Sequence, residues 1–346
     1  MSGYRGYNNY RGRTSKGKTV LTVVLILIIL ASIGFMLLQK YVVYDAAGTP
    51  HLMRPGRETT EPVLPEEGEE ELNLTISPSE QKAFVSRSFS VTEALTMESW
   101  RQAWTEAPKG CNAVTADMKV SGSGKLFFDA KEMAGGARAT KNDTPAALME
   151  MLRGDTAVGY TVARMSCFHD SIAARWAVED MGLKNTGGYI FYDGRNTQWL
   201  DPAKEGARKY LCGMAVELAE LGFDEILLTD VSYPTEGKLD KIDYGDTVKA
   251  RNLQTFLEEM RAALEPYEVK LSLELSEAIL IEGSDNAAGI IAADLIPLAD
   301  RLYVETDAGS VEELRSVMAR LDETVEFVPI LSPDSELPEE GSFLLR

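Results

Sequence analysis

The chain has 346 residues, of which 45% are hydrophobic and 26% charged. This composition is typical of a globular protein and argues against a disordered chain, a collagen-like fibre or a polytopic membrane protein. Fifty-four acidic and 35 basic residues give a net charge of -19, so we expect no binding to nucleic acid, whose phosphates such a chain repels. Three scattered cysteines and two histidines predict neither a disulfide framework nor a zinc site, and we expect no metal or cofactor.

The first 40 residues differ in charge from the rest of the chain. They contain six basic residues and no acidic one. Residues 19–39 are uncharged and mostly apolar, and about 20 such residues in a helix span the ~30 Å core of a bilayer. The pattern predicts a basic cytoplasmic tail (1–18) and a single transmembrane helix (19–39) that anchors the chain in the cell membrane. Ala46, Ala47 and Gly48 leave a cleaved signal peptide open as the alternative.

Residues 40–80 are rich in proline and glutamate. Proline opposes regular packing, and like charges repel one another and extend the chain. The range contains Pro50, Pro55, Pro62, Pro65 and Pro78, together with Glu66, Glu67, Glu69, Glu70 and Glu71. We therefore predict a flexible linker that carries a domain at residues 81–346 outside the cytoplasm.

The domain at 81–346 alternates between short β-rich runs and helical patterns. The expected strands are 83–88, 113–118, 157–164, 225–229, 269–275, 301–305, 325–331 and 342–345. The expected helices are 97–104, 145–152, 202–221, 247–264 and 310–321. About eight repeats of strand and helix in about 250 residues predict an α/β fold, a (β/α)8 TIM-like barrel. An open doubly wound sheet is the alternative, but no glycine-rich nucleotide-binding loop follows a strand.

Charged side chains recur inside the expected strands. In a barrel, alternate residues of each strand point into the lumen, and chemistry takes place at the C-terminal strand ends. A period of two places Asp117, Lys119, Arg164, Lys270, Glu274 and Glu305 on the lumen side. Because burying an unpaired charge is costly, these residues should form ion pairs or face a solvent-filled cleft. Acidic residues near three strand ends favour a cleft.

Several motifs, in order along the chain, carry a resemblance to a known family. They are residues 163–170 (ARMSCFHD), 199–202 (WLDP), 221–234 (LGFDEILLTDVSYP) and 269–274 (VKLSLE), with Asp117 and Lys119 in a D-x-K segment. The motifs resemble those of the bacterial family known as putative glycoside hydrolases, envelope-associated TIM barrels of α-amylase-like ancestry. The resemblance covers roughly residues 81–305 and makes this chain a divergent member, with an expected activity on O-glycosyl bonds.

The fourth strand departs from the family pattern. The family's aspartate falls on Thr229, its tyrosine on Asp230 and its arginine on Ser232. A one-residue bulge would bring the carboxylate of Asp230 into the expected place, because a bulge re-aims side chains. Without it, the strand-four carboxylate is missing, and a catalytically inactive barrel that binds carbohydrate or an envelope protein becomes the alternative function.

Glycoside hydrolysis requires two carboxylates across the scissile bond, one protonated and one ionised. A separation of about 5 Å predicts retention of anomeric configuration, and roughly 6.5–9.5 Å predicts inversion. We expect Glu274 to be the general acid and Asp230 its ionised partner. The expected contacts to a polysaccharide or oligosaccharide come from Asp117, Lys119, Arg164, Trp199 and Glu305, with Trp199 as a stacking platform. A metal-dependent hydrolase using Asp117, Glu274 and Glu305 is a weaker alternative.

Overall fold

The computed structural model describes residues 42–44, 50–52, 83–89, 97–107, 110–131, 149–150, 154, 157–335 and 341–346. The predicted tail (1–18) and transmembrane helix (19–39) lie outside these residues. Within the described ranges, no helix is long and apolar enough to cross a membrane. The chain divides into two compact units, Met1–Ile76 and Ser77–Arg346.

The described part of the first unit is a small β-hairpin inside the predicted linker. Its strands are β1 (Val42–Tyr44) and β2 (Pro50–Leu52), which pair antiparallel. The remaining residues of the range 40–80 are outside the described part of the chain.

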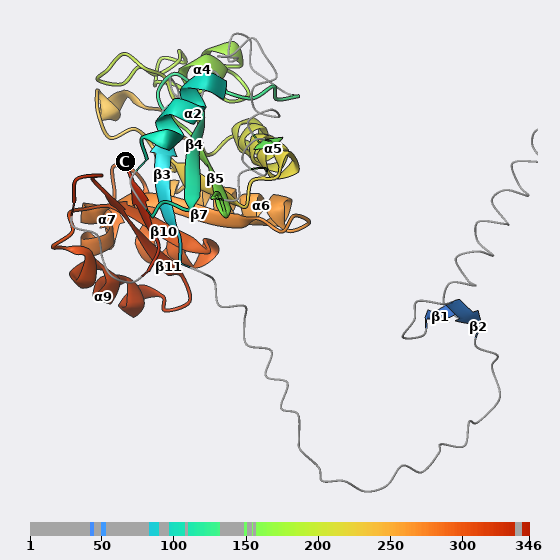
Figure 1. Cartoon of the computed structure of the whole chain (residues 1–346). Coiled ribbons are helices and arrows are strands. Elements are labelled where there is room, and N and C mark those ends of the chain that lie inside the picture. The colour runs from blue at the N-terminus through green and yellow to red at the C-terminus, as the bar shows by residue number, and fades with distance from the viewer. Residues whose placement is uncertain are drawn as a thin grey trace, which may run out of the picture. The chain divides into compact units, whose positions relative to one another are not determined.

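Eight parallel strands of the second unit form a closed barrel in chain order (Figure 1). They are β3 (Val85–Phe89), β4 (Ala113–Lys119), β5 (Tyr160–Ser166), β6 (Glu225–Thr229), β7 (Lys270–Ser276), β10 (Arg301–Glu305), β11 (Glu326–Leu331) and β12 (Phe343–Leu345). Each expected strand corresponds to one of these, so the predicted TIM-like barrel is confirmed. The open doubly wound sheet is wrong, because β12 pairs with β3 and closes the ring.

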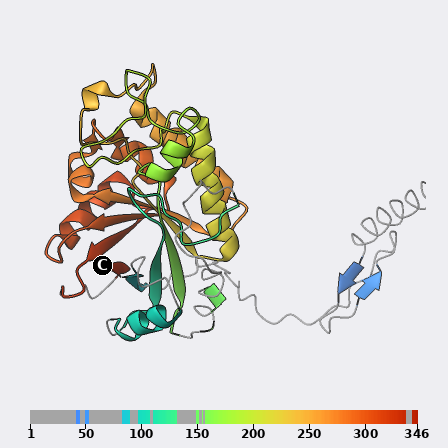
Figure 2. The ribbon, with the colours of Figure 1, turned by 90° about the horizontal axis from the view of Figure 1, so that it is seen from above.

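Helices follow most of the strands. They are α2 (Met97–Thr105), α4 (Ser171–Trp176), α5 (Glu205–Leu221), α6 (Lys249–Leu264), α7 (Glu277–Glu282), α8 (Ala292–Leu295) and α9 (Val311–Leu321), with 3-10 turns η1 (Leu239–Lys241) and η2 (Ile296–Leu298). A second hairpin joins β8 (Ser284–Asp285) to β9 (Ile290–Ile291). The longest helices, α5 and α6, pack against one another beside the strands (Figure 2). The expected helix at 145–152 lies mostly outside the described residues.

The start of α5 differs from its prediction. The sequence Asp201-Pro202 is typical of a helix start, but the helix begins at Glu205. Asp201 Oδ1 instead accepts a hydrogen bond from the Ala203 backbone N–H at 3.0 Å, which closes a turn before the helix. An aspartate that caps a turn has the same local signature as one that caps a helix.

The apolar core has two layers, as the period of two predicts. Small and branched side chains such as Ala113, Val162 and Leu227 fill the barrel lumen. Their strand neighbours, including Val114 and Leu271, point outward and pack against the helices. A period of two in sequence thus separates lumen from outer layer.

A buried ion-pair network closes the N-terminal end of the lumen. The Glu225 carboxylate accepts hydrogen bonds from Ser272 Oγ (2.6 Å) and Tyr160 OH (2.9 Å) and pairs with Arg301. Arg301 also pairs with Glu326 at 2.6 Å. Burial and the charge of Glu225 raise the pKa of Tyr160, and Glu225 keeps the pKa of Arg301 high although burial alone would lower it. These groups begin their strands, so the network serves the fold and lies far from the C-terminal strand ends.

Candidate active site

A cavity of about 570 Å³ opens at the C-terminal ends of β6, β7 and β10. Its lining carries five carboxylates, those of Asp230, Glu274, Glu277, Asp285 and Glu305. Three of them, Asp230, Glu274 and Glu305, are predicted site residues from three different strand ends. This is the end of a TIM barrel at which ligands bind, so the cavity is the candidate active site.

Asp230 reaches the cavity through an unusual backbone conformation. The pairing of β6 with β5 and β7 has no register shift, so this strand carries no one-residue bulge. Asp230 instead has a positive φ of 53°, a left-handed conformation that few residues other than glycine adopt. Its Oδ2 accepts a hydrogen bond at 2.5 Å from Ser166 Oγ, at the end of the neighbouring strand. Asp230 thus lines the cavity in a left-handed conformation and without a bulge.

Glu274 and Glu305 share one cation, Arg346. The guanidinium lies 3.1 Å from Glu274 Oε1 and also pairs with Glu305. Arg346 directly follows β12, so its side chain crosses the barrel mouth to reach β7 and β10. The other oxygen of Glu274, Oε2, is buried and has no hydrogen-bond partner among the described residues. The two oxygens of this carboxylate therefore stand in different surroundings.

Asp117 and Arg164, both predicted substrate contacts, lie near the C-terminal ends of β4 and β5. Arg164 Nε and Asp117 Oδ1 are 2.6 Å apart, and both side chains are partly exposed. The two residues are register partners, and a register shift follows directly between Asp117 and Lys119. Asp117 thus has a cation in direct contact, as Glu274 and Glu305 do.

Lys119 is the predicted contact that lies deepest in the protein. Its side chain is fully buried and pairs at 2.8 Å with the equally buried Asp170. It also donates a hydrogen bond to the Ser166 carbonyl at 2.8 Å. Asp170 in turn caps α4 through the Ala173 N–H at 2.8 Å. The expectation of a direct substrate contact needs correction, because the lysine holds the loop after β5 and has no surface for a ligand.

Trp199 is also more enclosed than a stacking platform requires. Only 8% of the residue is exposed. The His169 ring is stacked on it with centroids 4.2 Å apart and planes 10° apart. Its indole N–H donates to Asp193 Oδ2 at 2.9 Å, and His169 Nε2 lies 2.7 Å from Thr197 Oγ1. Burial lowers the pKa of His169, an effect that the charges of Asp230 and Asp193 oppose.

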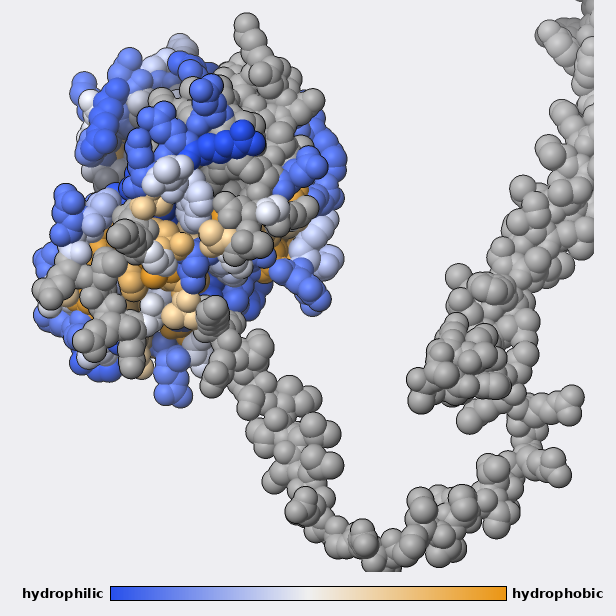
Figure 3. All heavy atoms as spheres, in the orientation of Figure 1, coloured by the Kyte–Doolittle hydropathy of each residue, from blue (hydrophilic) through white to orange (hydrophobic). Residues whose placement is uncertain are grey.

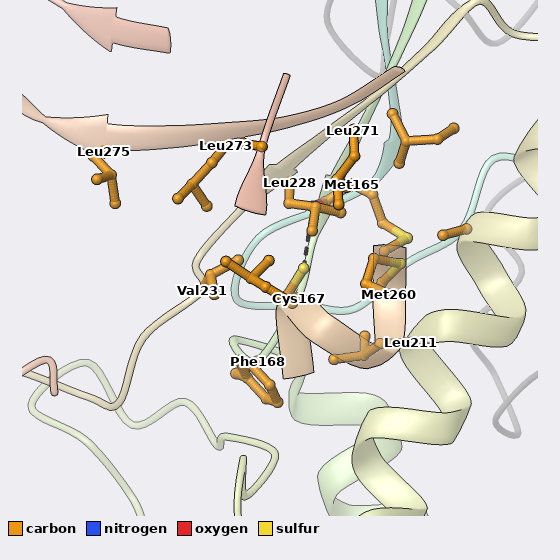
Figure 4. Close-up of a cluster of buried hydrophobic side chains, with 14 of the residues drawn as sticks. Met165, Cys167, Phe168, Leu211, Leu228, Val231, Met260, Leu271, Leu273 and Leu275 are labelled. Carbon is orange, nitrogen blue, oxygen red and sulfur yellow. Dashed lines mark hydrogen bonds between the residues drawn. The ribbon is translucent and has the colours of Figure 1, made fainter. Parts of the chain in front are cut away.

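Cys167 lies in an apolar cluster behind the strand ends (Figure 4). Met165, Leu228, Leu271 and Met260 surround it in that view. Burial raises the pKa of the Cys167 thiol well above its usual value. Since the thiolate is the nucleophile, this cysteine belongs to the core and not to the active site.

The described residues contain no group of three or more His, Cys, Asp or Glu side chains arranged to hold a metal ion. The three carboxylates considered for such a site have other partners in the structure. Asp117 pairs with Arg164, and Glu274 and Glu305 pair with Arg346.

The fold and the cavity define a class of protein: a TIM barrel with acidic side chains from several strands at its C-terminal end. The chain belongs to the family described as "Putative glycosyl hydrolase domain", whose model matches residues 95–296. The resemblance seen in the motifs is thereby confirmed. The matched residues contain both expected catalytic carboxylates, Asp230 and Glu274.

Solved structures resemble the chain at low sequence identity. The PgaB (BpsB) glycoside hydrolase domain from Bordetella bronchiseptica has a TM-score of 0.51 and 13% identity, over 72% of this chain and 83% of that one. A hypothetical protein from Ruminiclostridium thermocellum ATCC 27405 has a TM-score of 0.46 and 22% identity, over 54% of this chain and 95% of that one. No protein with a curated description matches the chain in sequence.

Proposed function

We propose that the chain is a membrane-anchored glycoside hydrolase that acts outside the cytoplasm on a polysaccharide or oligosaccharide of the envelope or its surroundings. One observation carries this proposal: Asp230 and Glu274, from the paired strands β6 and β7, line one cavity at the C-terminal end of the barrel. Two carboxylates on one cleft are what cleavage of a glycosidic bond requires.

Glu274 is the general acid in this proposal. It gives its proton to the glycosidic oxygen as the bond to the anomeric carbon breaks. Arg346 holds Oε1 of this carboxylate and so fixes its orientation at the cavity wall.

Asp230 is the ionised partner at the anomeric carbon. The hydrogen bond from Ser166 fixes its orientation. Around this pair, Asp117, Arg164 and Glu305 bind sugar hydroxyls. Lys119 has an indirect role. It donates a hydrogen bond to the carbonyl of Ser166, and the hydroxyl of Ser166 orients Asp230.

The alternative is a barrel that binds a carbohydrate or an envelope protein without turnover. The observation in its favour is Thr229, which stands where the family has its aspartate. Asp230 supplies a carboxylate one residue later, in a left-handed backbone conformation. Under this alternative, amide substitutions at Asp230 or Glu274 would alter affinity at most.

The charge of the cavity limits which charge class of glycan can bind there. Asp230, Glu277 and Asp285 have no ion-pair partner among the described side chains, and Glu274 and Glu305 share one. A cavity with an excess of negative charge repels a polyanion and favours a neutral or amino-bearing sugar. Uronic-acid polymers are therefore poor substrates.

The test is incubation of the full chain, in detergent micelles, with defined glycans. Maltohexaose, cellohexaose, chitohexaose, hexaglucosamine, hexagalacturonate and peptidoglycan cover both anomers and all three charge classes. We expect cleavage of a neutral or amino-bearing glycan and none of the uronate. Binding of a glycan without cleavage of any would support the inactive barrel, and preferred cleavage of the uronate would contradict the electrostatic argument.

The placement outside the cytoplasm rests on the uncharged run at 19–39 and the basic residues before it. The same incubation with intact cells tests it. The cleavage rate should be equal before and after lysis, and a large increase on lysis would place the domain inside.

A further inference from the structure

Two large aromatic side chains stand on the surface of the segment between β5 and α5. Tyr189 is 75% exposed and Tyr192 is 49% exposed, whereas Phe191 between them is buried. This segment follows the C-terminal end of β5, the end of the barrel at which the cavity opens. Among the coloured atoms in the upper part of the domain in Figure 3, where α4 of the same segment lies, most are hydrophilic.

The backbone that presents the two tyrosines is held by many hydrogen bonds. Asn185 N donates to the Tyr189 carbonyl at 2.7 Å, and Phe191 N donates to the Leu183 carbonyl at 2.8 Å. The loop is also tied to its neighbour, because Thr186 N donates to the Lys241 carbonyl at 2.8 Å. A loop fixed in this way presents its aromatic rings without a large loss of entropy when a ligand binds.

Tyr192 is joined to the cavity rim through its neighbours. Asp193, the next residue, is fixed by the Trp199 indole and abuts Gly237, where an added Cβ would lie 3.1 Å from the Asp193 Cα. Arg195 of the same loop also pairs at 2.8 Å with Glu236, the residue before Gly237. Thr235, directly before Glu236, lines the cavity. The loop of Tyr192 therefore contacts the segment that also lines the candidate active site.

We propose that Tyr189 and Tyr192 form an aromatic subsite that binds sugar units of a glycan chain extending out of the cavity. The occupant is a carbohydrate because the apolar face of a pyranose ring packs on an aromatic ring, while the tyrosine hydroxyl and the polar surroundings meet its hydroxyls. Single exposed aromatics are common and need no explanation, but these two stand three residues apart on one hydrogen-bonded loop that contacts the segment lining the cavity.

The subsite rests on the proposed function for the identity of its ligand. It adds that the protein binds chains longer than a disaccharide. It also moves the stacking role from the enclosed Trp199, whose ring is stacked against His169, to residues whose rings are accessible.

The test compares long and short ligands on the full chain by calorimetry. Maltohexaose, cellohexaose and chitohexaose are each titrated beside their disaccharides into the wild type, Tyr192→Ala and Tyr189→Ala. We expect at least one hexasaccharide to bind, with its affinity lowered about 3- to 10-fold in each variant and that of its disaccharide unchanged. The control is Tyr267→Ala, in the segment between α6 and β7 at the opposite end of the barrel, which should leave both affinities unchanged.

Three results would overturn the subsite: no binding of any hexasaccharide, equal loss for both chain lengths, or the same loss in the control. The proposed hydrolysis can fail separately. Length-dependent binding that the tyrosines control, without cleavage, would retain the subsite and support the inactive barrel. Cleavage that is insensitive to both tyrosines would retain the hydrolase and exclude the subsite.

Discussion

Asp230→Asn should abolish hydrolysis, with a fall in kcat of about 10³-fold or more. The amide is nearly isosteric but cannot carry the charge that stabilises or attacks the anomeric carbon. The loss should be as large on a dinitrophenyl glycoside as on the natural glycan, because Asp230 acts at the anomeric carbon and does not supply the proton to the leaving group. Initial rates on both substrates measure the effect.

The matched control is Asp240→Asn, whose carboxylate is 72% exposed in η1. It should keep full activity and the same melting temperature as the wild type. Substantial residual turnover in Asp230→Asn, with the fold intact, would mean that the left-handed residue does not replace the family's strand-four carboxylate.

Arg301→Met should lower the free energy of unfolding by about 3–5 kcal/mol. The substitution leaves the fully buried carboxylate of Glu225 without its cation, although Ser272 and Tyr160 still donate to it. Glu326 loses the same partner. Urea unfolding followed by circular dichroism measures the change.

The matched control for this effect is Arg315→Met in α9. Arg315 pairs with Glu312 at the surface, 3.5 Å apart, and such pairs contribute about 0–1 kcal/mol. The double variant Glu225→Gln, Arg301→Met should recover part of the lost stability, since it removes the unpaired charge. Equal stability of Arg301→Met and the wild type would show that the network at the N-terminal end does not hold the barrel together.

The barrel itself was predictable from sequence because its determinants are local. Each strand is a short run with a period of two, and each of the long helices has an apolar face of its own, as in 249–264. Charged residues at strand ends were equally visible, since the end of a parallel strand fixes the side of the barrel on which its residues lie. Asp230, Glu274 and Glu305 line one cavity for that reason.

The partners of those residues were not predictable in the same way. Arg346 is far in sequence from Glu274 and meets it only because β12 closes the ring. The left-handed conformation of Asp230 has no marker in the residue type beyond the tolerance of aspartate for it. The motif WLDP pointed to Trp199 but did not predict that the His169 ring stacks on it. Such stacking depends on how the loops after β5 fold over one another.

The measurement that tests the central claim most directly is the rate of Glu274→Gln on two substrates that differ in their leaving group. A general acid is needed for a sugar leaving group but not for dinitrophenolate, which departs without a proton. The account predicts that Glu274→Gln loses about 10²–10⁴-fold in kcat on the natural glycan and keeps most of its rate on the dinitrophenyl glycoside. Equal loss on both substrates, or wild-type cleavage of the glycan, would contradict it.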